Sequence, residues 1–88
     1  MKAVLEIPIT TATEQNVSIP YGAVPLEVKY NTSNALCLYV FGISTKATYN
    51  VKLCMYESGI EITDNCTHFI NTVTINGNTK FVFVDGLI

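Results

Sequence analysis

The stretch NALCLYVFGI, residues 34 to 43, constrains the fold more than any other part of the chain because it is apolar on both faces of an extended strand. Alternate side chains of a strand point to opposite faces, here Leu36, Leu38 and Val40 to one and Ala35, Cys37, Tyr39 and Phe41 to the other. Such a strand must be covered on both sides. Eighty-eight residues can hardly supply three layers. We therefore expect a second copy of the chain to cover part of one face, either the Leu36 to Val40 face or the Tyr39 and Phe41 face.

A period of two also dominates the rest of the chain, which indicates strands rather than helices. The alternating positions are Leu5, Ile7 and Ile9; Val17 and Ile19; Leu26, Val28 and Tyr30; Tyr49, Val51, Leu53 and Met55; and Ile60 and Ile62, which mark a short return strand. Pro8 predicts an edge position for the first strand, because proline cannot donate to a ladder. The segment IPYGA predicts a chain reversal, since Pro20 presets φ and Gly22 tolerates positive φ.

The clearest supersecondary signal lies near the C-terminus, where FINTVTI and KFVFV flank the turn NGNT. Asn76 and Gly77 form the residue pair that a type I′ hairpin turn prefers, because both central positions need positive φ. The alternation predicts that Phe69, Val73 and Ile75 face the core, whereas Asn71, Thr72 and Thr74 are mostly solvated. The segment TDNCTH before this hairpin is polar, and it predicts a loop or a single helical turn.

These signals predict one all-β domain over residues 1–88, without linker, repeat or low-complexity segment. The expected architecture is a small antiparallel sandwich or barrel of seven to eight short strands that ends in a hairpin. A core of this size is marginal by itself, so association with another subunit would add useful buried apolar area.

Charge and hydropathy disfavour two classes of partner. The formal net charge is −2, and all five basic residues are lysines. Nucleic-acid binding needs a basic stripe and commonly uses the bidentate arginine fork, so we expect no nucleic-acid partner. We also expect no membrane contact, because the longest apolar run is far shorter than the ~20 residues of a spanning helix. The opening MKAVLEIPIT has no apolar region like that of a signal peptide.

Cysteine and histidine offer little chemistry at these spacings. Cys37 and Cys54 lie in apolar strands, where a free cysteine behaves as a small buried hydrophobe, and a disulfide scaffold is not expected. Cys66 and His68, with Asp64 nearby, are too few ligands for a zinc site. The same pair could serve nucleophilic catalysis only if the fold oriented it, and a surface histidine in a loop is the simpler interpretation. We expect no metal, no cofactor and no enzymatic activity.

Aromatic residues give the one candidate binding site. Tyr39, Tyr49 and Tyr56 lie on or beside the strands that also carry Lys52. An aromatic wall with a lysine suits a small anionic or planar ligand. The alternative is that these rings serve core packing or a subunit interface.

Several segments together resemble a family of short β-rich proteins encoded by tailed bacteriophages and prophages, most of which have no assigned function. The matching segments cover almost the whole chain: MKAVLEIPIT, EQNVSIP, IPYGAVPLEV, CLYV, YNVKL ending in ESG, and FINTVTINGNTKFVFV. Members often have Cys-Leu-Trp where this chain has Cys37-Leu38-Tyr39, and a Gly-Thr-Gly-His turn where it reads YESGIE. The second departure puts any family function of Tyr56 to Glu61 in doubt.

The resemblance implies phage origin and a setting in the host bacterial cytoplasm, but no mechanism. The leading hypothesis is a phage accessory protein, a non-enzymatic homo-oligomer that binds or sequesters a small host molecule such as a nucleotide-derived defence signal. The absence of arginine counts against a phosphate-rich ligand. Two alternatives remain open: a minor tail or baseplate component of the virion, and a direct protein inhibitor of a host defence enzyme.

Overall fold

The computed structural model describes residues 1–62 and 68–88 and confirms the all-β prediction. Seven antiparallel strands form two sheets, and no helix occurs in the described part of the chain. The strands are β1 (Ala3–Pro8), β2 (Glu14–Pro20), β3 (Val24–Tyr30), β4 (Leu36–Gly42), β5 (Thr48–Tyr56), β6 (His68–Ile75) and β7 (Asn78–Asp85). No helix among these residues is long and apolar enough to cross a membrane.

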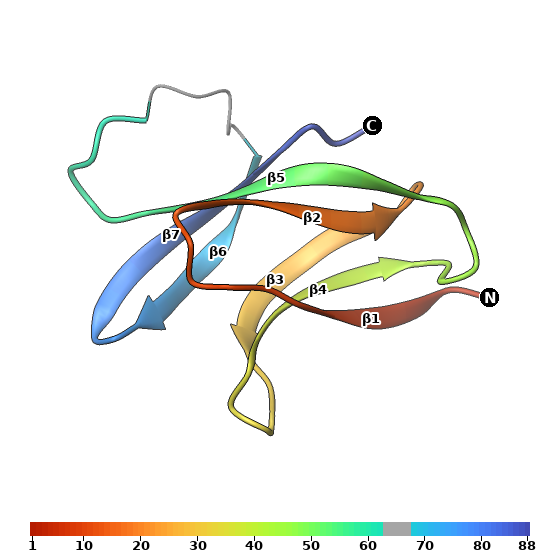
Figure 1. Cartoon of the computed structure of the whole chain (residues 1–88), viewed down its shortest axis with the longest axis horizontal. Helices are drawn as coiled ribbons and strands as arrows, with labels where there is room; N and C mark the ends of the chain where they lie inside the picture. Colours follow the sequence, from red (N-terminus) through yellow and green to blue (C-terminus); the bar gives the residue numbers. More distant parts are fainter. Residues whose placement is uncertain (63–67) are drawn as a thin grey trace.

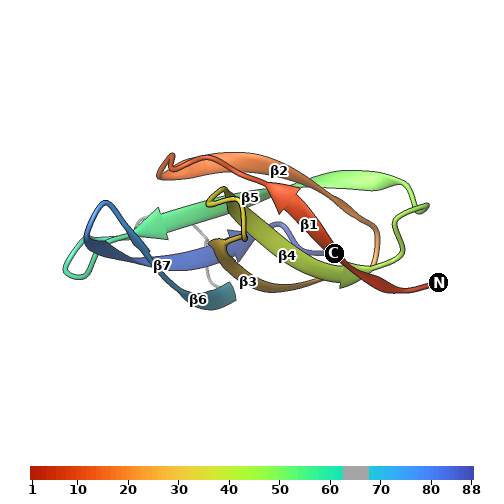
Figure 2. The same cartoon turned by 90° about the horizontal axis from the view of Figure 1, so that it is seen from below.

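The strand order is β1-β4-β3 in one sheet and β2-β5-β7-β6 in the other (Figure 1). β4 is the centre of the three-stranded sheet, as expected for the NALCLYVFGI stretch, and β1 is an edge, as Pro8 predicted. β3 and β6, each at an edge of its own sheet, lie side by side in both views (Figure 2). The two sheets therefore meet along this side.

Both sheets contribute to one core, so the architecture is a sandwich. Its buried members are Val17, Ile19, Ala23, Val28, Leu36, Leu38, Val40, Val51, Leu53, Met55, Val73, Ile75, Val82 and Val84. The Leu36, Leu38 and Val40 face of β4 therefore packs inside the same chain. Of the two faces that could have met a second copy, only the Tyr39 and Phe41 face is left on the outside.

Both turns predicted from the sequence, at Asn76-Gly77 and at Gly22, are present in the structure. Asn76 and Gly77 both have positive φ, 52° and 81°, between the paired residues Ile75 and Asn78, as a type I′ hairpin requires. Gly22 follows β2 with φ of 77°, and the Ala23 amide donates to the Pro20 carbonyl at 3.1 Å. Both predicted reversals are confirmed.

A β-bulge in β6 overturns part of the facing prediction for the hairpin. The register passes from Phe69 opposite Phe83 to Asn71 opposite Val82, so β6 carries one extra residue, Ile70. This shift turns Phe69 outward, where half of it is exposed. Asn71 lies after the bulge, alternates with the buried Val73 and Ile75, and is half-buried. The prediction that Phe69 faces the core was wrong because a bulge breaks the period of two. The prediction that Asn71 is solvated was wrong because Asn71 shares the face of Val73 and Ile75, where its side chain bonds to the main chain of Val28.

A second bulge lies in β3 between Pro25 and Glu27. Leu26 is the extra residue and is exposed, whereas Val28 is buried as predicted. The expected strand at Ile60 and Ile62 is absent: both residues are exposed and lie outside the strands. Two apolar residues with the right spacing are thus not enough to form a strand without a partner.

Of the two cysteines that were expected to be free and buried, Cys37 is free but Cys54 is not. Cys37 is a buried free cysteine, as predicted, but Cys54, which is also buried, is disulfide-bonded. Asp64 and Cys66, on which the metal and nucleophile interpretations depended, lie outside the described residues. His68 is the exposed first residue of β6 rather than a loop residue.

Candidate functional site

The outer face of the three-stranded sheet presents three cross-strand rows. From the register of β1 and β3 against β4, the rows are Val4, Phe41 and Val24; Glu6, Tyr39 and Glu27; and Pro8, Cys37 and Lys29. Opposite residues of antiparallel strands share a face, so each row runs across the sheet as a band of neighbouring side chains. The face is therefore graded from apolar at one end to polar and charged at the other.

We call Val4, Phe41 and Val24 the apolar row. Their exposed fractions are 59%, 40% and 54%. Leu26, the extra residue of the β3 bulge, is also exposed and lies two residues after Val24 in the chain. The ammonium of Lys2 lies 5.7 Å from the centre of the Phe41 ring, within cation–π range. A large exposed aromatic ring between two exposed valines is typical of an interaction surface.

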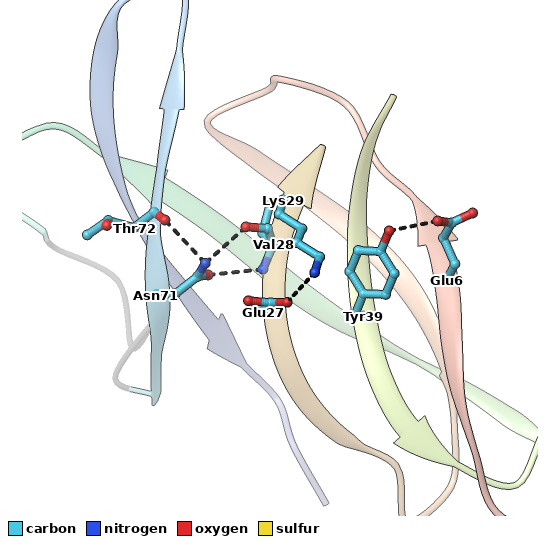
Figure 3. Close-up of polar contacts among 7 residues, drawn as sticks. All are labelled: Glu6, Glu27, Val28, Lys29, Tyr39, Asn71 and Thr72. Carbon is cyan, nitrogen blue, oxygen red and sulfur yellow. Dashed lines mark hydrogen bonds and ion pairs between the residues drawn. The ribbon is translucent and has the colours of Figure 1, made fainter. Parts of the chain in front are cut away.

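The second row is a polar network centred on Tyr39 (Figure 3). The Tyr39 hydroxyl donates to Glu6 Oε1 at 2.7 Å. Lys29 Nζ lies 5.2 Å from the centre of the Tyr39 ring and 2.9 Å from Glu27 Oε1. The hydrogen bond to Glu6, followed by burial and the negative charge of Glu6, raises the pKa of Tyr39 to about 12. The phenol is thus a neutral hydrogen-bond donor at physiological pH.

Cys37 lies between Pro8 and Lys29 in the third row and is shielded from solvent. Asn31 Nδ2 lies 3.6 Å from its sulfur, and the thiol points to the carbonyl of Ala35 at 3.5 Å. Burial, together with the charge of Glu6, raises the pKa of the thiol. A buried thiol with a raised pKa is a poor nucleophile, so this cysteine supports packing rather than chemistry.

Tyr49, the second predicted site residue, packs against the core at the start of β5. Its ring stacks on Tyr21 with centroids 4.8 Å apart and an angle of 26°. Its hydroxyl accepts a hydrogen bond from the Ile88 amide at 3.2 Å. Tyr49 therefore closes one end of the sandwich and holds the C-terminus.

Lys52 and Tyr56 do come together, on the outer face of the four-stranded sheet. Lys52 Nζ lies 3.5 Å from one oxygen of Glu14, and the Tyr56 hydroxyl donates to the other oxygen at 3.3 Å. Two hollows adjoin this group. One, of about 280 Å³, is lined by Thr13, Met55, Tyr56, Glu57, Ile60 and Lys80. The other, of about 190 Å³, is lined by Glu14, Gln15, Asn16 and Lys52.

The electrostatics of these hollows are balanced. Lys80 Nζ lies 3.0 Å from Glu57 Oε1, and Lys52 faces Glu14. Because each lysine has a carboxylate beside it, a polyanion would meet repulsion as well as attraction. The volumes are at or below the usual lower end for small-molecule pockets, roughly 300 Å³. The geometry therefore fits a small ligand with both donor and acceptor groups.

The four predicted site residues thus fall into three places. Lys52 and Tyr56 meet around Glu14, Tyr49 supports the core, and Tyr39 lies on the outer face of the other sheet. The structure does not bring all four to one site. Period-two counting placed the rings near Lys52 along the chain, but it could not assign β4 and β5 to different sheets.

Several residues of both surfaces escaped sequence analysis. Glu14 and Lys80 reach their partners through strand pairing that joins segments distant in the chain. Val4 and Val24 flank Phe41 only once β1 and β3 are known to pair with β4. The apolar outer face of β4 was the only sequence signal for the apolar row.

Within residues 1–62 and 68–88, no group of three or more His, Cys, Asp or Glu side chains could hold a metal ion. Four of the described carboxylates instead contact lysines or tyrosine hydroxyls, namely those of Glu6, Glu14, Glu27 and Glu57.

Comparison with known families adds one assignment. Residues 1–85 match the family described as Domain of unknown function (DUF7352). The chain belongs to this family. No curated protein matches the chain, and no solved structure does so either. Because the DUF7352 description carries no activity, the function must be argued from the two surfaces described above.

Proposed function

We propose that the protein is a non-enzymatic binding protein that associates with itself through the outer face of the three-stranded sheet and holds a small host molecule. The observation that carries this proposal is the apolar row, in which Val4, Phe41 and Val24 lie side by side and stay exposed in the single chain. Exposed contiguous apolar surface of this kind is typical of protein interfaces.

Self-association has a physical motive in a chain of this size. Burial of apolar surface is worth roughly 25 cal/mol per Å², and an 88-residue domain buries a smaller fraction of its surface than a larger one. Covering the apolar row with a second subunit adds burial that the single chain lacks. The same contact shields the Tyr39 network from water.

The small-molecule part of the proposal concerns the corner around Glu14, where Lys52 and Tyr56 meet. Its two hollows offer a phenol, two lysine–carboxylate pairs and the apolar side chains of Met55 and Ile60. Such a lining favours a planar ligand with several donors and acceptors, such as a nucleobase or nucleoside, over a polyphosphate. A nucleotide-derived defence signal would then be recognised mainly through its base.

The proposed setting follows from the resemblance to phage proteins and is the host bacterial cytoplasm. A phage accessory protein that sequesters a host molecule needs no catalytic group. Such a protein must be abundant and stably folded, and its binding site must match the shape of the ligand.

Native mass spectrometry of the protein purified from a bacterial host tests both parts in one spectrum. We expect an oligomer that carries additional nonprotein mass, and this mass should decrease in the Tyr56→Ala variant but not in the Tyr30→Ala variant. An oligomer without extra mass would contradict ligand sequestration. A bare monomer would contradict self-association and favour a role that depends on another partner, either in the virion or as a protein inhibitor.

A further inference from the structure

We infer that the second copy docks face to face on the three-stranded sheet, with the two-fold axis of the dimer running along the apolar row. This inference rests on the proposed self-association and adds the orientation of the two copies. It follows from the order of side chains on β1 and from the rows that the register defines.

The apolar row matches itself under this symmetry. A two-fold axis that lies in the interface along the row places each residue opposite its own counterpart in the second copy. Phe41 then meets the Phe41 of the second copy, and the valines at both ends of the row do the same. Stacked sheets pack about 10 Å apart, which the side chains of the row can fill.

The charges of Lys2, just before β1, and Glu6, on β1, also become complementary. Lys2, Val4 and Glu6 are spaced by two residues and share the outer face, so Lys2 and Glu6 lie on opposite sides of the apolar row. Each is displaced from the row by two residues, or about 6.6 to 6.8 Å along the strand. The two-fold rotation reverses the strand direction, so Lys2 of each copy faces Glu6 of the other. Symmetry makes two such ion pairs for every dimer.

The other simple orientation is electrostatically unfavourable. A two-fold axis parallel to the strands would keep each row opposite the same row of the second copy. The row that contains Glu6 and Glu27 would then meet its own carboxylates. Like charges placed opposite one another across an interface destabilise it and select against that orientation. Charge therefore favours the axis along the apolar row.

A charge exchange within one chain tests this orientation. We expect Lys2→Glu alone and Glu6→Lys alone each to raise the dimer dissociation constant about 10-fold at low salt, because two attractions become two repulsions. The double variant Lys2→Glu with Glu6→Lys restores both attractions and should return to within about threefold of the original value. Lys46→Glu, an exposed lysine outside the three-stranded sheet, is the matched control and should leave dimerisation unchanged.

Sedimentation velocity over a range of protein concentrations gives the dissociation constants. Glu6→Lys also removes the hydrogen bond from Tyr39, but that loss cannot be recovered by Lys2→Glu, so recovery in the double variant reports the contact between copies. A dimer in which the double variant is as weak as Glu6→Lys alone would overturn the orientation while leaving self-association intact. A protein that stays monomeric before any substitution would overturn both.

Discussion

The side chain of Asn71 forms two hydrogen bonds with the main chain of Val28 and thereby joins the two sheets (Figure 3). Its Oδ1 accepts from the Val28 amide at 3.0 Å, and its Nδ2 donates to the Val28 carbonyl at 2.9 Å. A primary amide here takes the part of a peptide group in a ladder. It satisfies main-chain groups at the edge of β3 that would otherwise need water or another strand.

Removing this amide should destabilise the whole sandwich. We expect Asn71→Ala to lower the free energy of unfolding by about 1 to 3 kcal/mol, because the half-buried amide and carbonyl of Val28 lose their partner. Urea denaturation followed by circular dichroism measures the change. Asn16→Ala, at an exposed position in β2, is the control and should change stability by less than about 0.5 kcal/mol. Equal effects from the two variants would contradict a structural role for Asn71.

A charged analogue sharpens the test. Asn71→Asp keeps an acceptor for the Val28 amide, but at neutral pH its carboxylate faces the Val28 carbonyl, to which Nδ2 donates in the native protein. The folded state should therefore favour the protonated acid and raise its pKa above the unfolded value of about 3.9. Relative to the native protein, Asn71→Asp should gain stability as the pH falls toward that value and lose it as the pH rises. Thermal denaturation at several pH values measures this, and no pH dependence of the difference would contradict it.

The side-chain amide of Gln15 likewise bonds to both main-chain groups of one residue, Thr10, where the chain passes from β1 to β2. Its Oε1 accepts from the Thr10 amide at 2.9 Å, and its Nε2 donates to the Thr10 carbonyl at 2.8 Å. These bonds are exposed, so water can replace them. We expect Gln15→Ala to cost about 0.5 to 1.5 kcal/mol in urea denaturation, less than Asn71→Ala. A larger loss of stability in Gln15→Ala than in Asn71→Ala would show that burial of the hydrogen bonds does not determine which variant is less stable.

Gly42 allows a close approach between the end of β4 and the turn after β2. A Cβ built on Gly42 would lie 2.8 Å from the Cβ of Ala23 and 3.1 Å from its Cα. We therefore expect Gly42→Ala to reduce the free energy of unfolding by about 1 to 3 kcal/mol through overpacking. The double variant Gly42→Ala with Ala23→Gly removes the shorter of the two contacts and should recover part of that loss. If the double variant were less stable than Gly42→Ala by the full cost of Ala23→Gly, the clash would not be the cause.

Tyr39 should titrate well above the ordinary range of a tyrosine. Its pKa is raised to about 12, first by the hydrogen bond to Glu6. The folded pKa exceeds the unfolded value of about 10, so its contribution to stability is complete below pH 10 and is lost as the pH rises through 12. Phenolate absorbance of the native protein minus that of Tyr39→Phe isolates the titration. Glu6→Ala should bring the midpoint down, and an unchanged midpoint would contradict the role of Glu6.

The parts of the fold that sequence predicted are those fixed by local pattern. The sequence of β4 predicts a central strand because both of its faces are apolar. Asn76-Gly77 predicts the hairpin of β6 and β7 because few residue pairs accept positive φ at both positions. Neither feature depends on knowing which strands pair. The same reasoning found the core positions Val17, Ile19 and Val28.

The parts that sequence could not predict depend on long-range pairing. The bulge at Ile70 turns Phe69 outward, and no turn residue or break in composition marks it. Tyr39 and Lys52 lie on consecutive strands of the chain, but these strands belong to different sheets. The residues predicted to form one ligand site are therefore separated. Side-chain amides that replace peptide groups, such as Asn71, are equally invisible until β3 and β6 are brought together.

The central claim, that the apolar row is a contact surface between copies, is tested most directly at Phe41. Size-exclusion chromatography with light scattering should show an oligomer for the native protein and a folded monomer for Phe41→Asp, because a carboxylate in the middle of the row cannot be buried against its own counterpart. Ile60→Asp, an exposed apolar position in neither sheet, should remain oligomeric. A native protein that is monomeric at every concentration, or an oligomer that Phe41→Asp leaves unchanged, would contradict the account.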